Sequence, residues 1–473
     1  MGKAWVKRWS PEGAGHRKNL IEGLNIEAFN AIEKMTWRLP PSKSHLIRWL
    51  VLAAQSNQTI TIRGVANAGQ DAQSMRRCLM QLGVRFEDID EHDNTLSVID
   101  NRDLEPHPQS VAWRVYGVGP EGFHPPVSVL HAGNSGTALR FLMAIAARFD
   151  RPTMLDGDAS LRGRNHSEII EQLNQFSIAC SQGTQEEGLP LLVQGPWIIP
   201  QEFQVQIQST SQSLSGWLLA SAAMPSSTSL QLIGKAVSQR HSALTLDLCR
   251  QVGAPYGDEM PEDLKGWTPF FKDQTVQIPP DASMMSFAFL ACQALKLEIG
   301  FENAPRLNDS IGHEILLEHA QAMGISYNDG NMSPTSTPLE TEVNLRDAND
   351  LITPLAALMA LAGGGQIVGA KHAAFKESNR LTRTQSLLQQ FGLKCELNDD
   401  GLTIGGGQHP VPPKDMVETH GDHRLHMTAL VLALAVPGVT FVESSTLHCV
   451  ADPSAIKRWT ETGATIETTL NQP

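Results

Sequence analysis

The sequence predicts an α/β protein built from two domains, and three observations support this prediction. The chain has 473 residues, more than a single ordinary hydrophobic core organises. Hydrophobic residues make up 41% and charged residues 18% of it, which is typical of a folded globular protein. Amphipathic helical stretches alternate with short β-prone runs, which favours repeated β/α units.

One recurring pattern marks these units: a helix ends at an apolar residue followed by glycine, and a β-prone run begins. Glycine permits the left-handed cap that turns a helix into the next strand. The last four of these glycines are about seventy residues apart, as expected for tandem units, although glycine-ended helices also occur in other α/β proteins. We predict six units, three per domain, with helix ends at Gly83, Ser177 in place of glycine, Gly253, Gly324, Gly392 and Gly463.

The chain is expected to pass between the domains twice, near Arg38–Pro41 and near Val276–Asp281. Residues 105–127 are rich in proline and glycine, and we expect them to form an inserted loop. The two crossings predict a first domain over residues 42–279 and a second domain over residues 21–41 and 280–473.

Composition argues against several classes of function. A formal net charge of −13 disfavours nucleic acid as the main partner, because nucleic-acid binders usually present a basic face. No stretch is long and uncharged enough to span a bilayer, so no membrane partner is expected. Residues 1–20 are basic but lack the apolar core of a signal peptide, and we expect a loose N-terminal extension. The six cysteines form no C-x-x-C pair, which indicates reduced thiols and a cytoplasmic location.

The helix predicted in "LPPSKSHLIRWLVLAA" begins with polar and cationic residues. Its apolar stripe leaves Ser44 and Arg48 one turn apart on another face, where both can contact one ligand. A helix N-terminus attracts anions, and Lys43 and Arg48 extend the same field. The alternative is an ordinary helix cap with solvated cations.

Polar starts recur in other predicted helices, and each alone is typical of an ordinary cap. They occur in "HAGNSGTALRFL", "DASLRGRNHSEII", "STSQSLSGWLL", "RDANDLITPLAAL", "FKESNRLTRTQ" and "THGDHRLHMTA". If the repeated units point these starts toward one cleft, the result is a cationic pocket in an acidic protein.

Five of these blocks, "LPPSKSHLIRWLVLAA", "GNSGTALR", "TSQSLSGWLL", "KESNRL" and "GDHRLHM", resemble the ordered signature blocks of the 5-enolpyruvylshikimate-3-phosphate synthase family. The likeness runs from about Arg38 to the C-terminus. It implies an inside-out α/β barrel of six βαβαββ-type units, three per domain. It also implies a transferase of the shikimate pathway that moves the enolpyruvyl group of phosphoenolpyruvate to the 5-hydroxyl of shikimate 3-phosphate and releases phosphate. No metal or organic cofactor is expected, and the expected state is a monomer.

The resemblance also implies the roles of individual residues. Shikimate 3-phosphate would be held by Ser44, Arg48, Thr210, Ser211, Ser238 and Lys376. Phosphoenolpyruvate would be faced by Lys43, Arg164, Gln212, Arg380 and Arg424, in a pocket lined by Asn134, Gly136 and the adjacent Thr137. Without a Cβ, Gly136 would leave this pocket its full depth, and inhibition by glyphosate is expected there. The alternative for Gly136 is a tight turn.

Addition to an enol ether needs one proton delivered to the methylene carbon and one removed from the attacking hydroxyl. Two carboxylates in unlike environments can divide these tasks. We expect Asp350 to act as the base and Glu377 as the proton donor, with Lys43 sharing in proton transfer. The alternatives are a helix cap for Asp350 and a solvated acid for Glu377.

The chain departs from the family pattern at several positions. Asp452 stands where the family has a lysine that contacts phosphoenolpyruvate, and losing a charge-assisted hydrogen bond costs about 1.5–3 kcal/mol. Compensation by Lys457 is one expectation and altered activity is the other. The remaining departures are Pro41 for glycine, His241 for tyrosine, His313 for an acid and Asn379 for aspartate.

Several other functions remain as alternatives. One is a noncatalytic or regulatory protein that kept the fold, and another is an enolpyruvyl transferase with a different phosphorylated acceptor. The histidines at 420, 423 and 426 have helical spacing, but no acidic partner motif accompanies them, so a metal hydrolase is disfavoured. "GVGPEG" lies among prolines and opens no predicted helix, which disfavours a dinucleotide site.

Overall fold

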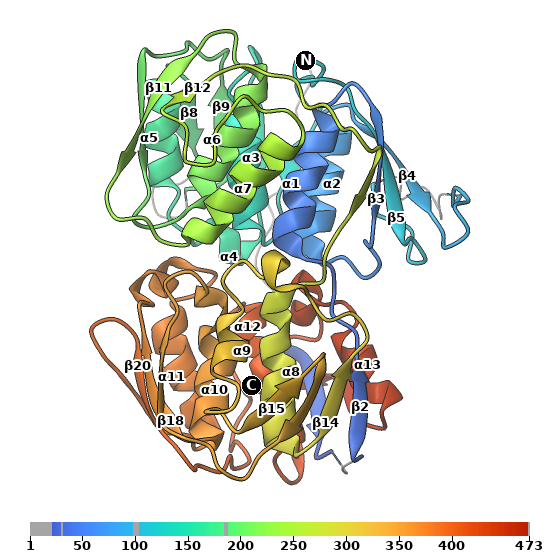
Figure 1. Cartoon of the computed structure of the whole chain (residues 1–473), viewed down its shortest axis with the longest axis vertical. Coiled ribbons are helices and arrows are strands. Elements are labelled where there is room, and N and C mark those ends of the chain that lie inside the picture. The colour runs from blue at the N-terminus through green and yellow to red at the C-terminus, as the bar shows by residue number, and fades with distance from the viewer. Residues whose placement is uncertain (1–20, 30–31, 98–103, 184–187, 472–473) are drawn as a thin grey trace, which may run out of the picture.

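The computed structural model describes residues 21–29, 32–97, 104–183 and 188–471. The predicted N-terminal extension, residues 1–20, lies outside this part of the chain. Figure 1 shows two lobes stacked along the longest axis, with α1 in the first lobe and α8 in the second. Among the described residues, no helix has the length and apolar character needed to cross a membrane.

The first unit shows the construction that the others repeat. Its sheet has the strand order β13-β3-β5-β4, in which β13 is parallel to β3 and the other pairs are antiparallel. Its elements are α1 (Lys43–Ala54), β3 (Thr59–Arg63), α2 (Gln70–Gln81), β4 (Arg85–Ile89), β5 (Ala112–Tyr116) and β13 (Thr275–Gln277). The last strand of the first lobe therefore pairs with a strand of its first unit.

Two further sheets complete the first lobe, with strand orders β6-β7-β9-β8 and β10-β11-β12. The second unit contains β6 (Leu130–His131), α3 (Gly136–Ala146), β7 (Thr153–Asp156), α4 (Ala159–Arg162), α5 (Ser167–Gln175), β8 (Ala179–Gln182) and β9 (Leu191–Gln194). The third contains β10 (Glu202–Gln206), α6 (Gln212–Ala220), β11 (Thr228–Ile233), α7 (Gln239–Gln251) and β12 (Asp263–Leu264).

The second lobe holds three sheets with the strand orders β15-β16-β14-β2, β17-β18-β20-β19 and β21-β1-β22. The first of its units contains β2 (Lys34–Trp37), α8 (Met285–Leu295), β14 (Glu298–Phe301), α9 (Ile315–Glu318), β15 (Ile325–Asn328) and β16 (Asn331–Pro334). The next contains β17 (Thr341–Asn344), α10 (Ile352–Leu361), β18 (Gly364–Val368), α11 (Arg380–Gln390), β19 (Cys395–Leu397) and β20 (Leu402–Gly405). The last contains α12 (His423–Leu434), β21 (Val439–Glu443), α13 (Ala455–Glu461), β22 (Ile466–Asn471) and β1 (Ile21–Glu27).

The predicted left-handed conformation is confirmed at all six positions, and five of the six helices end two residues before it; the exception is α9, which ends at Glu318, before Gly324. Each residue follows the second helix of its unit and has a positive φ, between 58° at Ser177 and 100° at Gly83. This is the left-handed conformation of a helix cap, which glycine adopts without a steric penalty. The strand expected directly after Gly253 is absent from the described structure, where β12 begins only at Asp263. Prolines in the intervening segment supply no backbone N–H for a strand ladder.

The expected inserted loop at residues 105–127 is partly wrong, because it contains β5. This strand lies between β3 and β4 and pairs with both. Its sequence, "AWRVY", is rich in β-prone residues. The prolines and glycines on both sides of it hid this signal.

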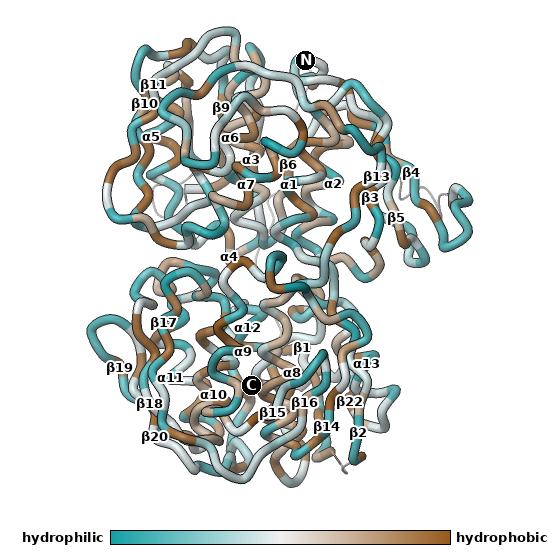
Figure 2. Tube along the Cα trace, viewed as in Figure 1, coloured by the Kyte–Doolittle hydropathy of each residue, from teal (hydrophilic) through white to brown (hydrophobic). Residues whose placement is uncertain are grey.

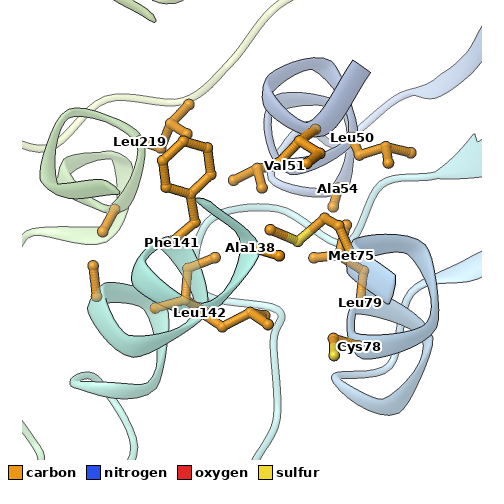
Figure 3. Close-up of a cluster of buried hydrophobic side chains, with 14 of the residues drawn as sticks. Leu50, Val51, Ala54, Met75, Cys78, Leu79, Ala138, Phe141, Leu142 and Leu219 are labelled. Carbon is orange, nitrogen blue, oxygen red and sulfur yellow. The ribbon is translucent and has the colours of Figure 1, made fainter. Parts of the chain in front are cut away.

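The helices pack against one another inside each lobe, with the sheets outside them. Figure 3 shows this in the first lobe, where Leu50 of α1, Met75 of α2, Phe141 of α3 and Leu219 of α6 meet in one cluster. Figure 2 shows hydrophobic stretches along these helices and hydrophilic residues along the outer loops. Every residue of α1 from His45 to Ala54 is buried, because helices surround it.

The buried hydrophobic residues form two separate groups. One runs from Leu46 to Ile278, and the other includes Leu39 and continues from Ala282. The two chain segments that connect them lie side by side: Ser42 N–H donates to Pro279 O at 2.8 Å and Asp281 N–H to Pro40 O at 2.9 Å. We propose that the boundary between the two domains lies at these two crossings, as the sequence predicts.

Candidate active site

A cavity of about 820 Å³ lies between the two lobes, a volume in the range of sites that hold small metabolites. Residues of both lobes line it, so neither lobe forms it alone. The predicted site residues in its lining are Lys43, Ser44, Arg48, Gly136, Thr137, Arg164, Thr210, Ser211, Gln212, Ser238, Asp350, Lys376 and Glu377.

Several helices begin at this cavity. α1 starts at Lys43, α3 at Gly136 and α6 at Gln212, while Ser238 and Asn379 precede α7 and α11. Each of these residues lines the cavity. Helix N-termini carry free N–H groups and the positive end of the helix dipole, so their convergence favours anions. The fold therefore brings together polar helix starts that are far apart in the sequence.

Ser238 is held in a left-handed conformation with φ of 50°, which is uncommon for residues other than glycine. Contacts from the second lobe surround it: its N–H donates to Arg346 O at 3.2 Å, and Asn349 Nδ2 donates to its Oγ at 3.4 Å. Such strained backbone is typical of functional sites.

Lys43 is paired with Asp71, a residue that the sequence analysis missed. Lys43 Nζ lies 2.9 Å from Asp71 Oδ2, and the Asp71 side chain is buried. Burial lowers the pKa of Lys43, but the carboxylates of Asp71, Glu377 and Asp350 raise it more, and the result is a raised pKa. Lys43 is therefore an ammonium cation at neutral pH. The sequence signal was Asp71 in the polar first turn of α2, a start like those of the other helices.

Arg380 binds both predicted catalytic carboxylates from the side that faces away from the cavity. Its side chain is only 1% exposed. Nη1 donates to Asp350 Oδ1 at 2.7 Å, Nη2 donates to Glu377 and Nε donates to Asp422 Oδ2 at 2.9 Å. Burial lowers the pKa of Arg380, but these carboxylates hold it above its ordinary value. Arg380 is absent from the cavity lining, so it orients lining residues from beneath.

Asp350 and Glu377 occupy more similar environments than we expected. Burial raises the pKa of Asp350, but Arg424 and other cations hold it well below its ordinary value. Burial also raises the pKa of Glu377, but Arg380 and other cations lower it by more. The result is a pKa well below the ordinary value. Because Arg424 acts most on Asp350 and Arg380 most on Glu377, both groups are carboxylates in this structure. The structure therefore shows no difference between the protonation states of the two acids.

Arg424 lies beside the cavity, and part of its guanidinium has no hydrogen-bond partner among the described residues. It lines a small adjoining hollow together with Lys43 and Asp350. Nη2 donates to Ser283 Oγ at 2.8 Å, whereas Nε and Nη1 are buried without a hydrogen-bond partner among the described residues. Buried donors of this kind are costly unless a ligand accepts from them.

Arg48 already makes several hydrogen bonds within the protein, although its predicted role is to bind a ligand. Its guanidinium donates to Thr245 Oγ1 at 2.6 Å, Ser44 O at 2.8 Å and His241 O at 3.1 Å. Asn134 likewise lies outside the cavity lining. Its Oδ1 accepts a hydrogen bond of 2.9 Å from Arg164 Nη2, so it positions that arginine.

Gly136 faces the cavity in an ordinary helical conformation, so no turn requires a glycine there. A Cβ built on it would lie 2.9 Å from Arg140 Nη1, 3.0 Å from Arg164 Nη1 and 3.3 Å from Gln212 Oε1. Real Cβ atoms rarely show such short contacts. The missing Cβ therefore leaves room for these three polar groups.

The departures from the family pattern have different structural outcomes. Asp452 is 1% exposed and pairs with Arg458 at 2.7 Å, outside the cavity lining. Lys457 is 75% exposed and pairs with Glu461, so it does not replace the missing lysine. Asn379 caps α11 by accepting from Thr382 N–H. His241 lines the cavity, and burial holds its pKa well below its ordinary value.

The histidines of "THGDHRLHM" do not form a metal site. Among the described residues, no group of three or more histidine, cysteine, aspartate or glutamate side chains could hold a metal ion. His423 and His426 are buried in α12, and burial lowers the pKa of both, in His426 to about 3. His426 is therefore a neutral residue of the core, whereas His423 is a buried residue on which the charges of Lys43 and Glu377 act.

Other cavity-lining residues were given no role from the sequence. They include Asp71, Arg140, Ser160, Asn165, Glu168, Gln206, Gln208 and Ser209. Arg140 was visible as the last residue of the "GNSGTALR" block. Glu168 and Gln208 come from α5 and the segment after β10, and only the tertiary structure places them together.

Comparison with known proteins places this chain in a family. Residues 28–452 match the family model of EPSP synthase (3-phosphoshikimate 1-carboxyvinyltransferase). A 3-phosphoshikimate 1-carboxyvinyltransferase of Methanothermobacter thermautotrophicus is 27% identical over 445 residues, which cover 93% of this chain and 98% of that protein.

Solved structures agree on the fold. An EPSP synthase from Acinetobacter baumannii superposes with a TM-score of 0.70 at 21% identity, covering 95% of this chain and all of the other. The enolpyruvyl transferase NikO from Streptomyces tendae superposes with a TM-score of 0.68 at 15% identity, covering 96% of this chain and all of the other. From the family match over most of its length, the chain belongs to the EPSP synthase family.

Proposed function

We propose that this protein transfers the enolpyruvyl group of phosphoenolpyruvate to the 5-hydroxyl of shikimate 3-phosphate and releases phosphate. One observation carries the proposal: cations and helix N-termini of both lobes meet in one cavity that also holds Asp350 and Glu377. The two substrates bring two phosphates and two carboxylates. A cavity with this charge distribution can neutralise them without a metal or an organic cofactor.

The proposed binding roles follow the two lobes. Shikimate 3-phosphate is held by Ser44, Thr210, Ser211, Ser238 and Lys376, with Arg48 supporting the floor of the site from α1. Phosphoenolpyruvate lies against the first-lobe residues Lys43, Gly136, Thr137, Arg164 and Gln212. Arg424 reaches it from the second lobe through its uncommitted nitrogens. Arg380 and Asn134 position other residues of the site.

The proposed reaction is an addition followed by an elimination. Asp350 removes the proton of the 5-hydroxyl as its oxygen bonds to the central carbon of phosphoenolpyruvate, and Glu377 delivers a proton to the methylene carbon. In the elimination, the bond to phosphate breaks, Glu377 takes a proton back from the new methyl group, and the proton that Asp350 took from the 5-hydroxyl leaves with the phosphate. This restores the double bond in the product.

Substrate charge supplies the unlike environments that this division of labour needs. The cations around Asp350 and Glu377 keep both pKa values low in the empty site. Bound phosphates and carboxylates compensate those cations, and they raise the pKa more for the carboxylate that lies nearer to them. Glu377, beside Arg164 and the phosphoenolpyruvate site, then gains the proton that it delivers.

A coupled assay for released phosphate tests the proposal, with shikimate 3-phosphate and phosphoenolpyruvate at millimolar concentration. Turnover that is lost in Glu377→Gln and Asp350→Asn supports it. Absence of phosphate release from the folded parent protein rejects it and leaves a noncatalytic family member.

A different phosphorylated acceptor is the second candidate, and histidines near Asp350 favour it. The buried His313 and His372, and the partly buried His241, each have one ring nitrogen without a hydrogen-bond partner among the described residues. Neutral imidazoles can accept from or donate to hydroxyl groups that a tyrosine or an acid would bind differently. Phosphate release with another phosphorylated alcohol, at a higher kcat/KM than with shikimate 3-phosphate, would select this candidate.

We also propose that the protein is a cytoplasmic monomer. All six cysteines are free thiols in the structure, which suits a reducing compartment. Light scattering coupled to size-exclusion chromatography tests the monomer.

A further inference from the structure

The first turn of α7 lies against the second lobe and receives its helix cap from there. Ser238, the residue before this helix, makes no capping hydrogen bond with its side chain within the described part of α7. The cap comes instead from Asp347, which lies between β17 and α10 in the second lobe: Gln239 N–H donates to Asp347 Oδ1 at 2.7 Å. Aspartate is a favoured cap because its oxygen accepts from a free N–H group and its charge meets the positive end of the helix dipole.

Further hydrogen bonds join the same two segments. Arg346 donates to Ala236 O through Nε at 3.2 Å and through Nη2 at 3.0 Å. In the other direction, Ser238 N–H donates to Arg346 O at 3.2 Å. Asn349 Nδ2 donates to Ser238 Oγ at 3.4 Å. The start of α7 is therefore bound to the second lobe through its backbone and through its capping residue.

Each of the joined segments carries a residue of the cavity. Ser238 lines it from the first lobe, and Asp350, three residues after Asp347, lines it from the second. The distance between them depends on how the two lobes meet, and the bond from Gln239 to Asp347 fixes that distance close to both. Proton removal from a bound hydroxyl needs such precision, because an error of about 1 Å can cost about 100-fold in rate.

We propose that Asp347 is a positioning residue, which caps α7 from the other lobe and thereby holds Ser238 and Asp350 in the relative position that proton removal from the acceptor requires. This inference rests on the proposed function. The left-handed backbone of Ser238 is uncommon for a residue with a side chain, and it persists only where surrounding contacts hold it. Those contacts come from the second lobe, so loss of the cap loosens a residue that binds the acceptor.

Two substitutions separate the cap from the charge. Asp347→Ala removes the cap, whereas Asp347→Asn keeps an oxygen that accepts the same hydrogen bond. Hydrogen exchange of the ligand-free protein, followed by mass spectrometry, measures the cap without turnover. The start of α7 should exchange about 5- to 30-fold faster in Asp347→Ala than in the parent, and in Asp347→Asn it should stay within about threefold. Asp247→Ala, at an exposed position on the same helix, is the control for net charge.

Steady-state kinetics by phosphate release test the positioning role. In Asp347→Ala, kcat should fall about 5- to 30-fold because the base is misplaced. The KM for phosphoenolpyruvate should stay within about twofold, because the residues proposed to bind it lie outside this contact. Asp347→Asn should restore kcat to within about threefold of the parent, and Asp247→Ala should leave it unchanged. Thermal unfolding of each variant establishes that it is folded.

The two measurements fail in different ways. Unchanged exchange at the start of α7 in folded Asp347→Ala overturns the cap, and so does an Asp347→Asn variant that behaves like Asp347→Ala. Faster exchange with an unchanged kcat overturns the positioning role. A parent protein that releases no phosphate rejects the proposed function and with it the positioning role, while the exchange experiment still decides whether Asp347 caps α7.

Discussion

The pair between Lys43 and Asp71 offers the sharpest test of how the cavity is organised. Asp71→Asn keeps the size of the side chain and removes its charge. Two unit charges 2.9 Å apart attract each other by about 6 kcal/mol at an effective dielectric constant of about 20. Asp350 and Glu377 still attract Lys43 after the change, so only part of this energy is lost. We expect the interaction that holds the Lys43 ammonium in its place to weaken by about 3 kcal/mol, as for other buried pairs that lose one partner.

Such a loss corresponds to a decrease of roughly 150-fold in kcat/KM for phosphoenolpyruvate. The pKa of Lys43 should also fall, because burial then meets less opposition. The alkaline limb of the pH profile of kcat/KM should therefore move to lower pH. Steady-state kinetics by phosphate release, measured across pH, gives both quantities.

A double-mutant cycle with Lys43→Met distinguishes this mechanism from a general loss of structure. If Asp71 acts through Lys43, Asp71→Asn has little further effect once the ammonium is absent. A kcat/KM for Asp71→Asn within threefold of the parent would refute the reasoning. An undiminished effect in the Lys43→Met background would refute it as well.

The remaining predictions concern shape, a buried pair and pH. Gly136→Ala should raise the KM for phosphoenolpyruvate about tenfold or more without lowering Tm, because its backbone is not left-handed; a lower Tm with unchanged KM contradicts this. Asp452→Asn should lower the free energy of unfolding in urea by about 3 kcal/mol, because Arg458 loses its buried partner, while the KM for phosphoenolpyruvate stays within about twofold. His426 has a folded-state pKa of about 3 and an unfolded value of about 6.5, so the unfolded state binds more protons between these values and acid destabilises the fold. Lowering the pH from 7.5 to 5 should remove about 2 kcal/mol of unfolding free energy through this residue, and His426→Asn should show a correspondingly smaller dependence on pH.

The sequence by itself determined the repeated architecture. Each of the six helix ends was visible because a left-handed cap is a local requirement that glycine meets best. The polar helix starts were visible for the same reason, since capping residues and hydrophobic periodicity act within a few residues of each other. β5 was missed because its local signal is short and neighbouring prolines and glycines outweighed it.

Only the tertiary structure decided which polar side chains act together. Lys43 meets Asp71 and Asp350 meets Arg380 across intervals of sequence that carry no pairing signal. The motif block contained Arg140, but its closeness to Arg164 depends on how α3 faces the segment before α5. The sequence placed Asp452 beside the substrate as an anion. In the fold its carboxylate pairs with Arg458 instead. Ion pairs and cavities depend on distances between elements, and these distances are set by the packing of whole lobes and not by neighbours in the chain.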